Sequence, residues 1–228
     1  MFGWGGGRVL RIDLSKRRFI VQSLDPSLAQ NYIGGRGFAA KTLWDELPPG
    51  VDPLSPLNKL ILAVGPLTAL PIPNSGKLLV ASKSPLTGGY GDGNIGTWLA
   101  VHMRRAGIDM MIIEGKAEKP TYLYIENKGD EFRVDFNNAE DLWGLDTFTT
   151  EDKLKTMHGS DVGMVLIGPA GERLVRFATI VAQKGGRSGG RPGMGAVMGS
   201  KNLKAIIMRG QGDVKVADPM LRKMGVDA

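Results

Sequence analysis

The stretch GMGAVMGSKNLKAIIMRG, Gly193–Gly210, repeats the order of an earlier one, GTWLAVHMRRAGIDMMIIEG, Gly96–Gly115. Each stretch begins with a glycine-rich turn, continues through a helical segment into an apolar run that fits a buried strand, and ends on a glycine. Because the same order of elements occurs twice, we expect two similar halves that face a shared site.

The rest of the chain alternates short extended runs with a few helical ones. Polar and apolar residues alternate in 8–14 and again in 18–22, which predicts an opening hairpin. Between Asp25 and Leu47 the apolar spacing becomes helical and is interrupted by glycines at 34–37, which predicts two short helices. Further strands are expected at 59–64, 77–82, 121–126, 132–136, 163–167 and 173–181, and a further helix at 147–158.

This pattern predicts an α+β fold of two pseudo-symmetric, mainly antiparallel sheets with short helices, and disfavours a doubly wound parallel sheet. A second echo, Pro66-Leu67-Thr68 and Pro85-Leu86-Thr87 after two apolar runs, is interpreted as a weak internal repeat. We expect one domain over residues 1–210. Residues 211–228 begin a new pattern, in which Ala217-Asp218-Pro219 is typical of a capped helix start leading toward further domains.

Composition limits the possible functions. With 228 residues, 42% of them hydrophobic and 23% charged, the chain can bury a core, and its net charge of +6 favours anionic partners. The absence of cysteine excludes disulfides, zinc–thiolate sites and any iron–sulfur cluster ligated by this chain. No secretion signal or bilayer-length apolar run is visible, so we expect a cytoplasmic protein without membrane partners.

The segment Lys184–Gly199, KGGRSGGRPGMGAVMG, places Arg187 and Arg191 in a run of glycines. Glycine lets backbone N–H groups approach a ligand, and arginine offers a planar fork of donors that matches phosphate oxygens. The segment therefore predicts an anion-binding loop. A solvated basic loop and an RNA-binding Arg-Gly segment are the alternatives. Apolar runs on both sides disfavour the first, and the absence of aromatic residues after Phe177 disfavours the second.

Two common nucleotide motifs do not fit this loop. A P-loop needs lysine directly after its last glycine, whereas Ser200 separates Gly199 from Lys201. The run Gly193–Gly199 departs from the dinucleotide fingerprint by one inserted residue. The sequence therefore disfavours nucleotide binding by either route.

A second glycine-rich segment, Gly88–Gly96, occupies the matching position of the repeat. Asp92 and Asn94 offer hard oxygens that suit Mg²⁺, although an ordinary Asp-Gly turn with a helix cap is the alternative. Lys77 and Lys83 flank the strand that leads into this segment and, taken singly, are typical surface lysines. Neither histidine has partners at metal-site spacing, and no catalytic triad or carboxylate pair is found. We assign no catalytic residue.

Several ordered blocks carry a family resemblance across nearly the whole chain. They are Asp52–Pro56, Asn58–Leu60, Gly65–Thr68, Lys83–Gly88, Glu114–Pro120, Ile167–Glu172 and Gly195–Ile206. In these blocks the chain resembles the N-terminal domain of tungsten-containing aldehyde:ferredoxin oxidoreductases. The resemblance implies two antiparallel sheets that form a base for two pterin dithiolenes, the bis-molybdopterin cofactor, which hold one tungsten or molybdenum atom. Four dithiolene sulfurs ligate the metal without any protein ligand, so a cysteine-free domain is compatible with it.

By position, the resemblance assigns the pterin phosphates and an associated Mg²⁺ to seven residues: Lys77, Asn94, Gly96, Arg187, Ser188, Gly190 and Arg191. The backbone carbonyls of Asn94 and Ser188 are the expected magnesium ligands. Lys77 stands where family members often have arginine, which keeps the charge but loses bidentate geometry. Pro192 stands where glycine is frequent, which stiffens the loop.

The whole-enzyme reaction that the resemblance implies is oxidation of an aldehyde with water to a carboxylic acid. Electrons would pass through a 4Fe-4S cluster held outside this chain to ferredoxin, and this chain would place the cofactor. The implied partners are the remaining domains or a cysteine-bearing subunit. A stand-alone pterin-cofactor carrier, or a small subunit of a multi-subunit oxidoreductase, is the alternative. Nucleic-acid binding is a weaker third reading, which predicts strongly salt-dependent affinity.

Overall fold

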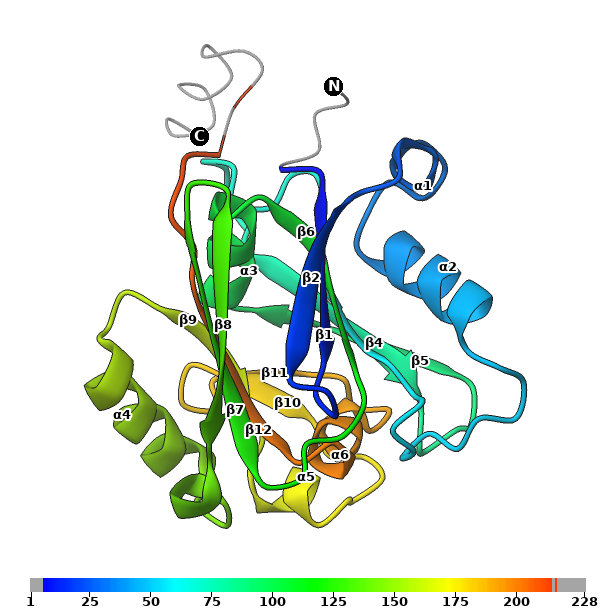
Figure 1. Ribbon diagram of the computed structural model, residues 1–228, viewed down its shortest axis with the longest axis vertical. Coiled ribbons are helices and arrows are strands. Elements are labelled where there is room, and N and C mark those ends of the chain that lie inside the picture. The colour runs from blue at the N-terminus through cyan, green and yellow to red at the C-terminus, as the bar shows by residue number, and fades with distance from the viewer. Residues whose placement is uncertain (1–5, 215, 217–228) are drawn as a thin grey trace.

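The computed structural model describes residues 6–214 and 216 and shows two six-stranded sheets with short helices around them (Figure 1). The first sheet has the spatial order β2 (Arg18–Ser23), β1 (Arg8–Asp13), β6 (Ile108–Glu114), β3 (Leu60–Ala63), β4 (Lys77–Lys83) and β5 (Tyr90–Gly96). The second has the order β8 (Glu131–Asn138), β7 (Thr121–Lys128), β12 (Leu203–Arg209), β9 (Gly163–Leu166), β10 (Ile180–Ala182) and β11 (Arg187–Gly189). The helices are α1 (Pro26–Tyr32), α2 (Arg36–Glu46), α3 (Trp98–Arg105), α4 (Thr147–His158), α5 (Pro169–Glu172) and α6 (Met194–Ser200), with a 3-10 turn η1 (Glu140–Leu142).

The two sheets are copies of one plan. Taken in order, each strand of the first sheet corresponds to the strand six later in the chain, so that β1 matches β7 and β5 matches β11. In each sheet one pair is parallel, β1 with β6 and β7 with β12, and the other pairs are antiparallel. The expected α+β fold with two pseudo-symmetric, mainly antiparallel sheets is confirmed.

Successive side chains of a strand point to opposite faces of its sheet, and here both faces are apolar. The two sheets therefore pack face to face through one apolar face each. Leu10 and Ile12 of β1 lie in the central core with Ile206 and Met208 of β12, and helices α3 and α6 add apolar residues to it. The opposite faces are apolar too. Helices α1 and α2 cover the outer face of the first sheet, and α4 covers that of the second (Figure 1). The outcome is a layered domain with three separate apolar clusters, one between the sheets and one under the helices on each outer face.

Local signals explain the helix starts. The side chains of Asp25, Thr97 and Asp146 accept hydrogen bonds from backbone N–H groups in the first turns of α1, α3 and α4. Such caps satisfy donors that a helix start leaves free. These helices, the opening hairpin and five of the six further strands lie where the sequence predicts them, with ends shifted by a few residues. No described helix is both long and apolar enough to cross a membrane.

Three expectations about the elements are wrong or need correction. The strand expected over 173–181 begins only at Ile180, because Pro169 starts the short helix α5 and turns follow it. The Pro-Leu-Thr echo lies in turns after β3 and β4, which are neighbours in one sheet, so it does not mark the duplication. The glycine-rich segments expected as loops instead contain the edge strands β5 and β11.

Two expectations about the end of the chain stay predictions. The helix start expected from Ala217 onward lies outside the described residues, and the domain boundary at residue 210 is not tested.

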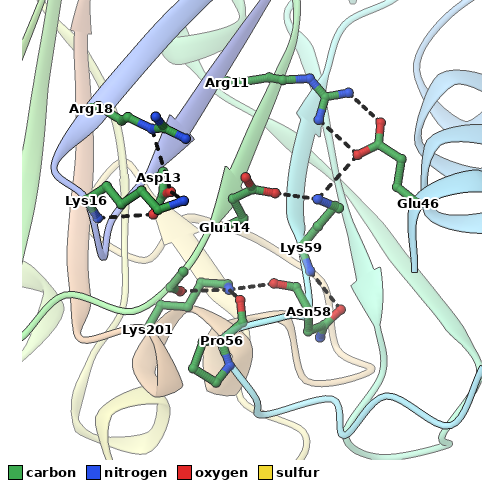
Figure 2. Close-up of polar contacts among 11 residues, drawn as sticks. Arg11, Asp13, Lys16, Arg18, Glu46, Pro56, Asn58, Lys59, Glu114 and Lys201 are labelled. Carbon is green, nitrogen blue, oxygen red and sulfur yellow. Dashed lines mark hydrogen bonds and ion pairs between the residues drawn. The ribbon is translucent and has the colours of Figure 1, made fainter. Parts of the chain in front are cut away.

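Lys201, which follows α6 in the second half, joins the two halves (Figure 2). Its side chain is fully buried, and Nζ donates to the backbone oxygens of Pro56 at 3.3 Å, Asn58 at 2.5 Å and Gly115 at 3.0 Å. All three carbonyls belong to the first half. Three acceptors match the three donors of an ammonium group, so the lysine acts as a buried polar pin between the halves.

An ionic network continues from this pin across the first sheet (Figure 2). Lys59 Nζ, close to the start of β3, donates to Glu114 and lies 3.3 Å from Glu46 Oε2. Glu46, at the end of α2, forms two hydrogen bonds with the guanidinium of Arg11 on β1. These contacts lower the pKa of Glu46 against the opposing effect of burial. The network ties α2 to β1, β3 and β6.

The buried Lys201 makes stability depend on pH. Burial lowers the pKa of Lys201 from 10.5 to about 7, an effect that Glu114 partly offsets. The unfolded chain keeps the ordinary pKa, so between these values the unfolded state binds a proton that the folded state has released. We therefore expect the Lys201 contribution to the free energy of unfolding to rise with pH above 7, by up to about 1.4 kcal/mol per pH unit. Urea unfolding of the wild type and of Lys201→Met between pH 7 and 10 isolates this contribution. An identical pH profile in both proteins would contradict it.

Candidate functional site

The edge strands of the two sheets, β5 and β11, lie against each other, and glycine makes this approach possible. A Cβ atom on Gly93 would lie 2.1 Å from the backbone nitrogen of Gly190, and one on Gly189 would lie 3.0 Å from the carbonyl oxygen of Asn94. Further along, a Cβ on Gly96 would lie 3.7 Å from the side chain of Arg187. The contacts run in opposite directions along the two strands. The glycine-rich segments of the repeat therefore meet at one site.

Gly93→Ala is expected to force these strands apart. Its Cβ would meet backbone, which cannot rotate away as a side chain can, so we expect a loss of about 1–3 kcal/mol in the free energy of unfolding. Gly76→Ala is the matched control, because a Cβ there would lie 4.0 Å from Thr97 O, its nearest neighbour among the described residues, which is an ordinary contact. Denaturant unfolding of both variants checks the prediction, and equal losses would contradict it.

Three basic side chains at this site lack a polar partner in the described part of the chain. Arg187, Arg191 and Lys77 are exposed, and none of them forms a hydrogen bond or ion pair with residues 6–214 or 216. Lys77 lies opposite Gly96 in the β4–β5 ladder, and Gly96 in turn lies against Arg187. Unpaired cations that share one surface raise the local positive potential. The site is therefore suited to a ligand with more than one anionic group.

The carboxylate of Asp92 is already occupied. The guanidinium of Arg36, at the start of α2, forms an ion pair with it, and the Tyr90 hydroxyl lies 3.1 Å from Asp92 Oδ2. The contact raises the pKa of Arg36, and burial followed by the charge of Asp92 raises the pKa of Tyr90. The sequence-based interpretation of Asp92 as a free hard-oxygen donor is thus not supported, and its structural role is to attach β5 to α2.

Asn94 and Ser188, the expected magnesium ligands, lie on the two facing strands. Asn94 pairs with Leu79 in the β4–β5 ladder, and Ser188 pairs with Val181 in the β10–β11 ladder. Both residues are exposed. Asn94 O lies toward Gly189, the residue after Ser188. The structure therefore brings the two residues to one place, while their role as ligands stays a prediction.

The turn before Arg187 has an unusual backbone. Gln183, Lys184 and Gly185 have φ values of 53°, 53° and 74°, and for the two non-glycine residues this left-handed conformation costs about 1–2 kcal/mol each. Glu151 of α4 accepts a hydrogen bond from the Lys184 backbone N–H at 2.7 Å. A hydrogen bond to a charged group contributes about 1.5–3 kcal/mol, enough to offset much of that cost. This contact lies between elements far apart in the sequence, and no sequence pattern indicates it.

The segment Lys184–Gly199, called the arginine loop below, is also held in place by a residue of the first half. The buried Ser84 hydroxyl donates to the carbonyl of Pro192 at 2.6 Å and accepts hydrogen bonds from the N–H groups of Leu86 and Thr87. Pro192, noted as a departure from the family pattern, packs beside Gly91, whose Cβ position lies 2.9 Å from it. The loop that carries Arg191 is therefore fixed by the partner half.

Neither histidine contributes to this site. His102 of α3 is buried, and its Nδ1 accepts a hydrogen bond from Gly210 N–H at 3.1 Å. His158 stacks on Tyr124 with the ring centroids 4.4 Å apart. Burial lowers the pKa of both imidazoles. Across the described part of the chain, no three His, Asp or Glu side chains gather into a metal site.

Comparison with known families gives a match over most of the chain. Residues 9–210 match a family model described as aldehyde ferredoxin oxidoreductase, N-terminal domain. The tungsten-containing aldehyde ferredoxin oxidoreductase of Pyrococcus furiosus is 46% identical over 220 residues, which are 96% of this chain and 35% of that protein. The WOR-like subunit of an aliphatic sulfonate oxidoreductase from the same organism is 36% identical over 223 residues, covering 90% of this chain and 34% of the subunit.

A solved structure shares the fold. In the active site complex BamBC of benzoyl coenzyme A reductase with 1,5 dienoyl-CoA, a chain that is 36% identical aligns with a TM-score of 0.88. The alignment covers 95% of the present chain and 32% of the other. The present chain thus spans about a third of the length of the relatives it matches.

Proposed function

Because the chain belongs to the aldehyde ferredoxin oxidoreductase family as its N-terminal domain, we propose that it is the base that binds a tungsten bis-molybdopterin cofactor. One observation carries the proposal. The two glycine-rich edge strands approach each other closely at Gly93 and Gly189, and within the described residues Arg187, Arg191 and Lys77 remain unpaired around them. Exposed backbone beside unpaired cations is the chemistry that a phosphorylated pterin requires.

The residues present fit the cofactor in kind. Arg187 and Arg191 would bind phosphate oxygens through planar forks of donors, and Lys77 would add a point charge. Gly96 would leave room for the ligand beside the backbone. Gly190 is buried, with its Cβ position 2.5 Å from Met194, so a contact from this residue would have to come from its backbone. The carbonyls of Asn94 and Ser188 would hold Mg²⁺, which prefers hard oxygen ligands. In this proposal the protein supplies no ligand to tungsten.

When bound, the cofactor supplies the two-electron chemistry that oxidises an aldehyde with water to a carboxylic acid. The chain itself would orient it and contribute no catalytic side chain. We place the 4Fe-4S cluster, the substrate pocket and transfer to ferredoxin in the remaining two thirds of a protein like the relatives, or in a separate subunit. On this view the 228 residues alone are inactive, and the protein acts in the cytoplasm.

Metal analysis tests the proposal. The chain would be produced in a host that makes the pterin cofactor, with tungstate or with molybdate, both alone and within the longer protein if the reading frame continues. We expect about one tungsten or molybdenum atom per chain in the longer protein, together with pterin fluorescence after denaturation. Absence of both metal and pterin from every preparation would contradict the proposal. Full retention by the 228 residues alone would instead favour a stand-alone cofactor carrier, because all seven proposed contacts lie in this chain.

A further inference from the structure

We infer that Glu151 is a positioning residue, whose buried carboxylate fixes the turn that places Arg187 for phosphate binding. The inference rests on the proposed function and deepens it. Glu151 lies in α4, outside the arginine loop and outside every segment that carries the family resemblance. It touches neither Arg187 nor any of the expected cofactor contacts, so it would act through the backbone.

The carboxylate is well placed to hold the turn. Its side chain is only 3% exposed, Oε2 accepts from the Lys184 N–H at 2.7 Å, and Oε1 accepts from Lys155 Nζ at 2.5 Å. Both oxygens are therefore engaged. A buried acceptor on a helix has little freedom to move, so the amide that it binds is fixed relative to α4 and the second sheet.

The turn needs such a support. Gln183, Lys184 and Gly185 are three consecutive residues at positive φ, and Gly186 N–H donates back to Gln183 O at 3.0 Å to close the turn. Arg187 follows immediately as the first residue of β11, a strand of three residues that pairs with β10 and has no other strand bonded to it. So short an edge strand gives its first residue little backbone support. The position of Arg187 then depends on the turn that precedes it.

The first half also ties an outer helix to the edge of its sheet, there by an ion pair between side chains instead of a hydrogen bond to the backbone. There α2, the counterpart of α4, attaches the edge strand β5 through the ion pair of Arg36 with Asp92. In the second half α4 attaches the β10–β11 turn through Glu151. In each half a charged side chain thus links the outer helix to the edge of its own sheet, to the edge strand β5 in the first half and to the turn before β11 in the second. Retention of this arrangement in both halves supports a role in placing the edges, in addition to any role in stability.

The chain offers a matched control beside Glu151. Asp152, the next residue of α4, forms an exposed ion pair with the Lys184 side chain at 2.7 Å, at 58% and 47% exposure respectively. It contacts the same residue but not its backbone. Exposed pairs contribute little, so Asp152→Asn should leave the turn in place.

The experiment compares Glu151→Ala, Glu151→Gln and Asp152→Asn in the full chain, with inorganic pyrophosphate as the probe in calorimetric titrations well below the unfolding temperature. We expect Glu151→Ala to weaken pyrophosphate binding about tenfold, and Glu151→Gln, whose amide oxygen still accepts a hydrogen bond, to stay within about threefold of the wild type. Hydrogen exchange of the Lys184 amide should accelerate in Glu151→Ala alone. Wild-type affinity together with a protected Lys184 amide in Glu151→Ala would overturn the inference, as would equal weakening by Asp152→Asn.

Two further arms keep the outcome decisive. If Glu151→Ala does not fold, Lys184 is replaced by its α-hydroxy acid analogue, so that an ester takes the place of its backbone amide and the donated hydrogen is removed. The same weakening of pyrophosphate binding is expected in this variant. An affinity equal to that of the wild type would overturn the inference. Arg187→Ala is titrated in parallel. Pyrophosphate affinity equal to the wild type in Arg187→Ala would count against the proposed function itself. Loss of affinity in Arg187→Ala but not in the Glu151 variants would count against the positioning role alone.

Discussion

A protein in which both Arg187 and Arg191 are replaced by alanine is expected to be purified without tungsten and without pterin. The two guanidinium groups are exposed and form no hydrogen bond or ion pair with the described part of the chain, so the fold does not need them. The free energy of unfolding should therefore change by less than about 0.5 kcal/mol. The ligand, in contrast, would lose two charge-assisted, bidentate contacts, each about twice as strong as a neutral hydrogen bond. Tungsten content per chain after gel filtration measures the effect.

Two controls separate geometry from charge in that experiment. Replacement of both arginines by lysine keeps the charge but loses the planar fork, so partial retention is expected. Arg105→Ala removes an exposed, unpaired arginine at the end of α3, outside the facing edge strands, and should retain the full tungsten content. A tungsten content equal to that of the wild type in the double alanine variant would show that Arg187 and Arg191 do not bind the cofactor.

Lys201→Met is expected to destabilise the domain by about 3–4 kcal/mol near pH 10, where the folded state no longer carries the cost of a charged buried lysine and the buried carbonyls of Asn58 and Gly115 each lose a donor worth about 1–3 kcal/mol. Within the described residues no other donor reaches these two oxygens. Methionine fills a similar volume, so the loss reports hydrogen bonding and not a cavity. In the wild type, keeping the buried lysine charged or deprotonating it costs free energy, and the methionine variant is free of this cost. This gain opposes the loss of hydrogen bonds, most strongly at low pH. The measured destabilisation should therefore grow toward pH 10.

Urea unfolding at pH 10 measures this loss. Lys119→Met is the control, because Lys119 forms only an exposed ion pair with Glu140 and should change stability by less than about 0.5 kcal/mol. A loss below about 1 kcal/mol in Lys201→Met would show that the two halves do not depend on the buried pin.

Much of the fold could be predicted because its signals are local. The alternation in β1 and β2, the helical spacing of α4 and the duplicated turn, helix and strand around α3 and α6 all lie within short windows of sequence. The arginine loop was also identified from the sequence, since few functions explain two arginines among so many glycines. The strands β5 and β11 were missed, because glycine has low strand propensity and no side-chain alternation to reveal one.

The supports of the site could not be predicted in the same way. Glu151 and Lys184 are 33 positions apart, and Ser84 and Pro192 are 108 positions apart. Each residue is ordinary in its own window. Asp92 shows the reverse case, because its carboxylate looks free in sequence and is bound by Arg36 from α2 in the structure.

The sequence by itself thus determined the duplicated plan and the apolar faces of the strands, and it predicted an anion-binding segment around Arg187 and Arg191, because these depend on residue type and on spacing along the chain. Only the tertiary structure decided that the two glycine-rich edges meet, which basic side chains stay unpaired beside them, and which distant residues hold the loop. The packing of the two sheets onto one core brings Gly93 to Gly190, and that proximity depends on how the halves fold together.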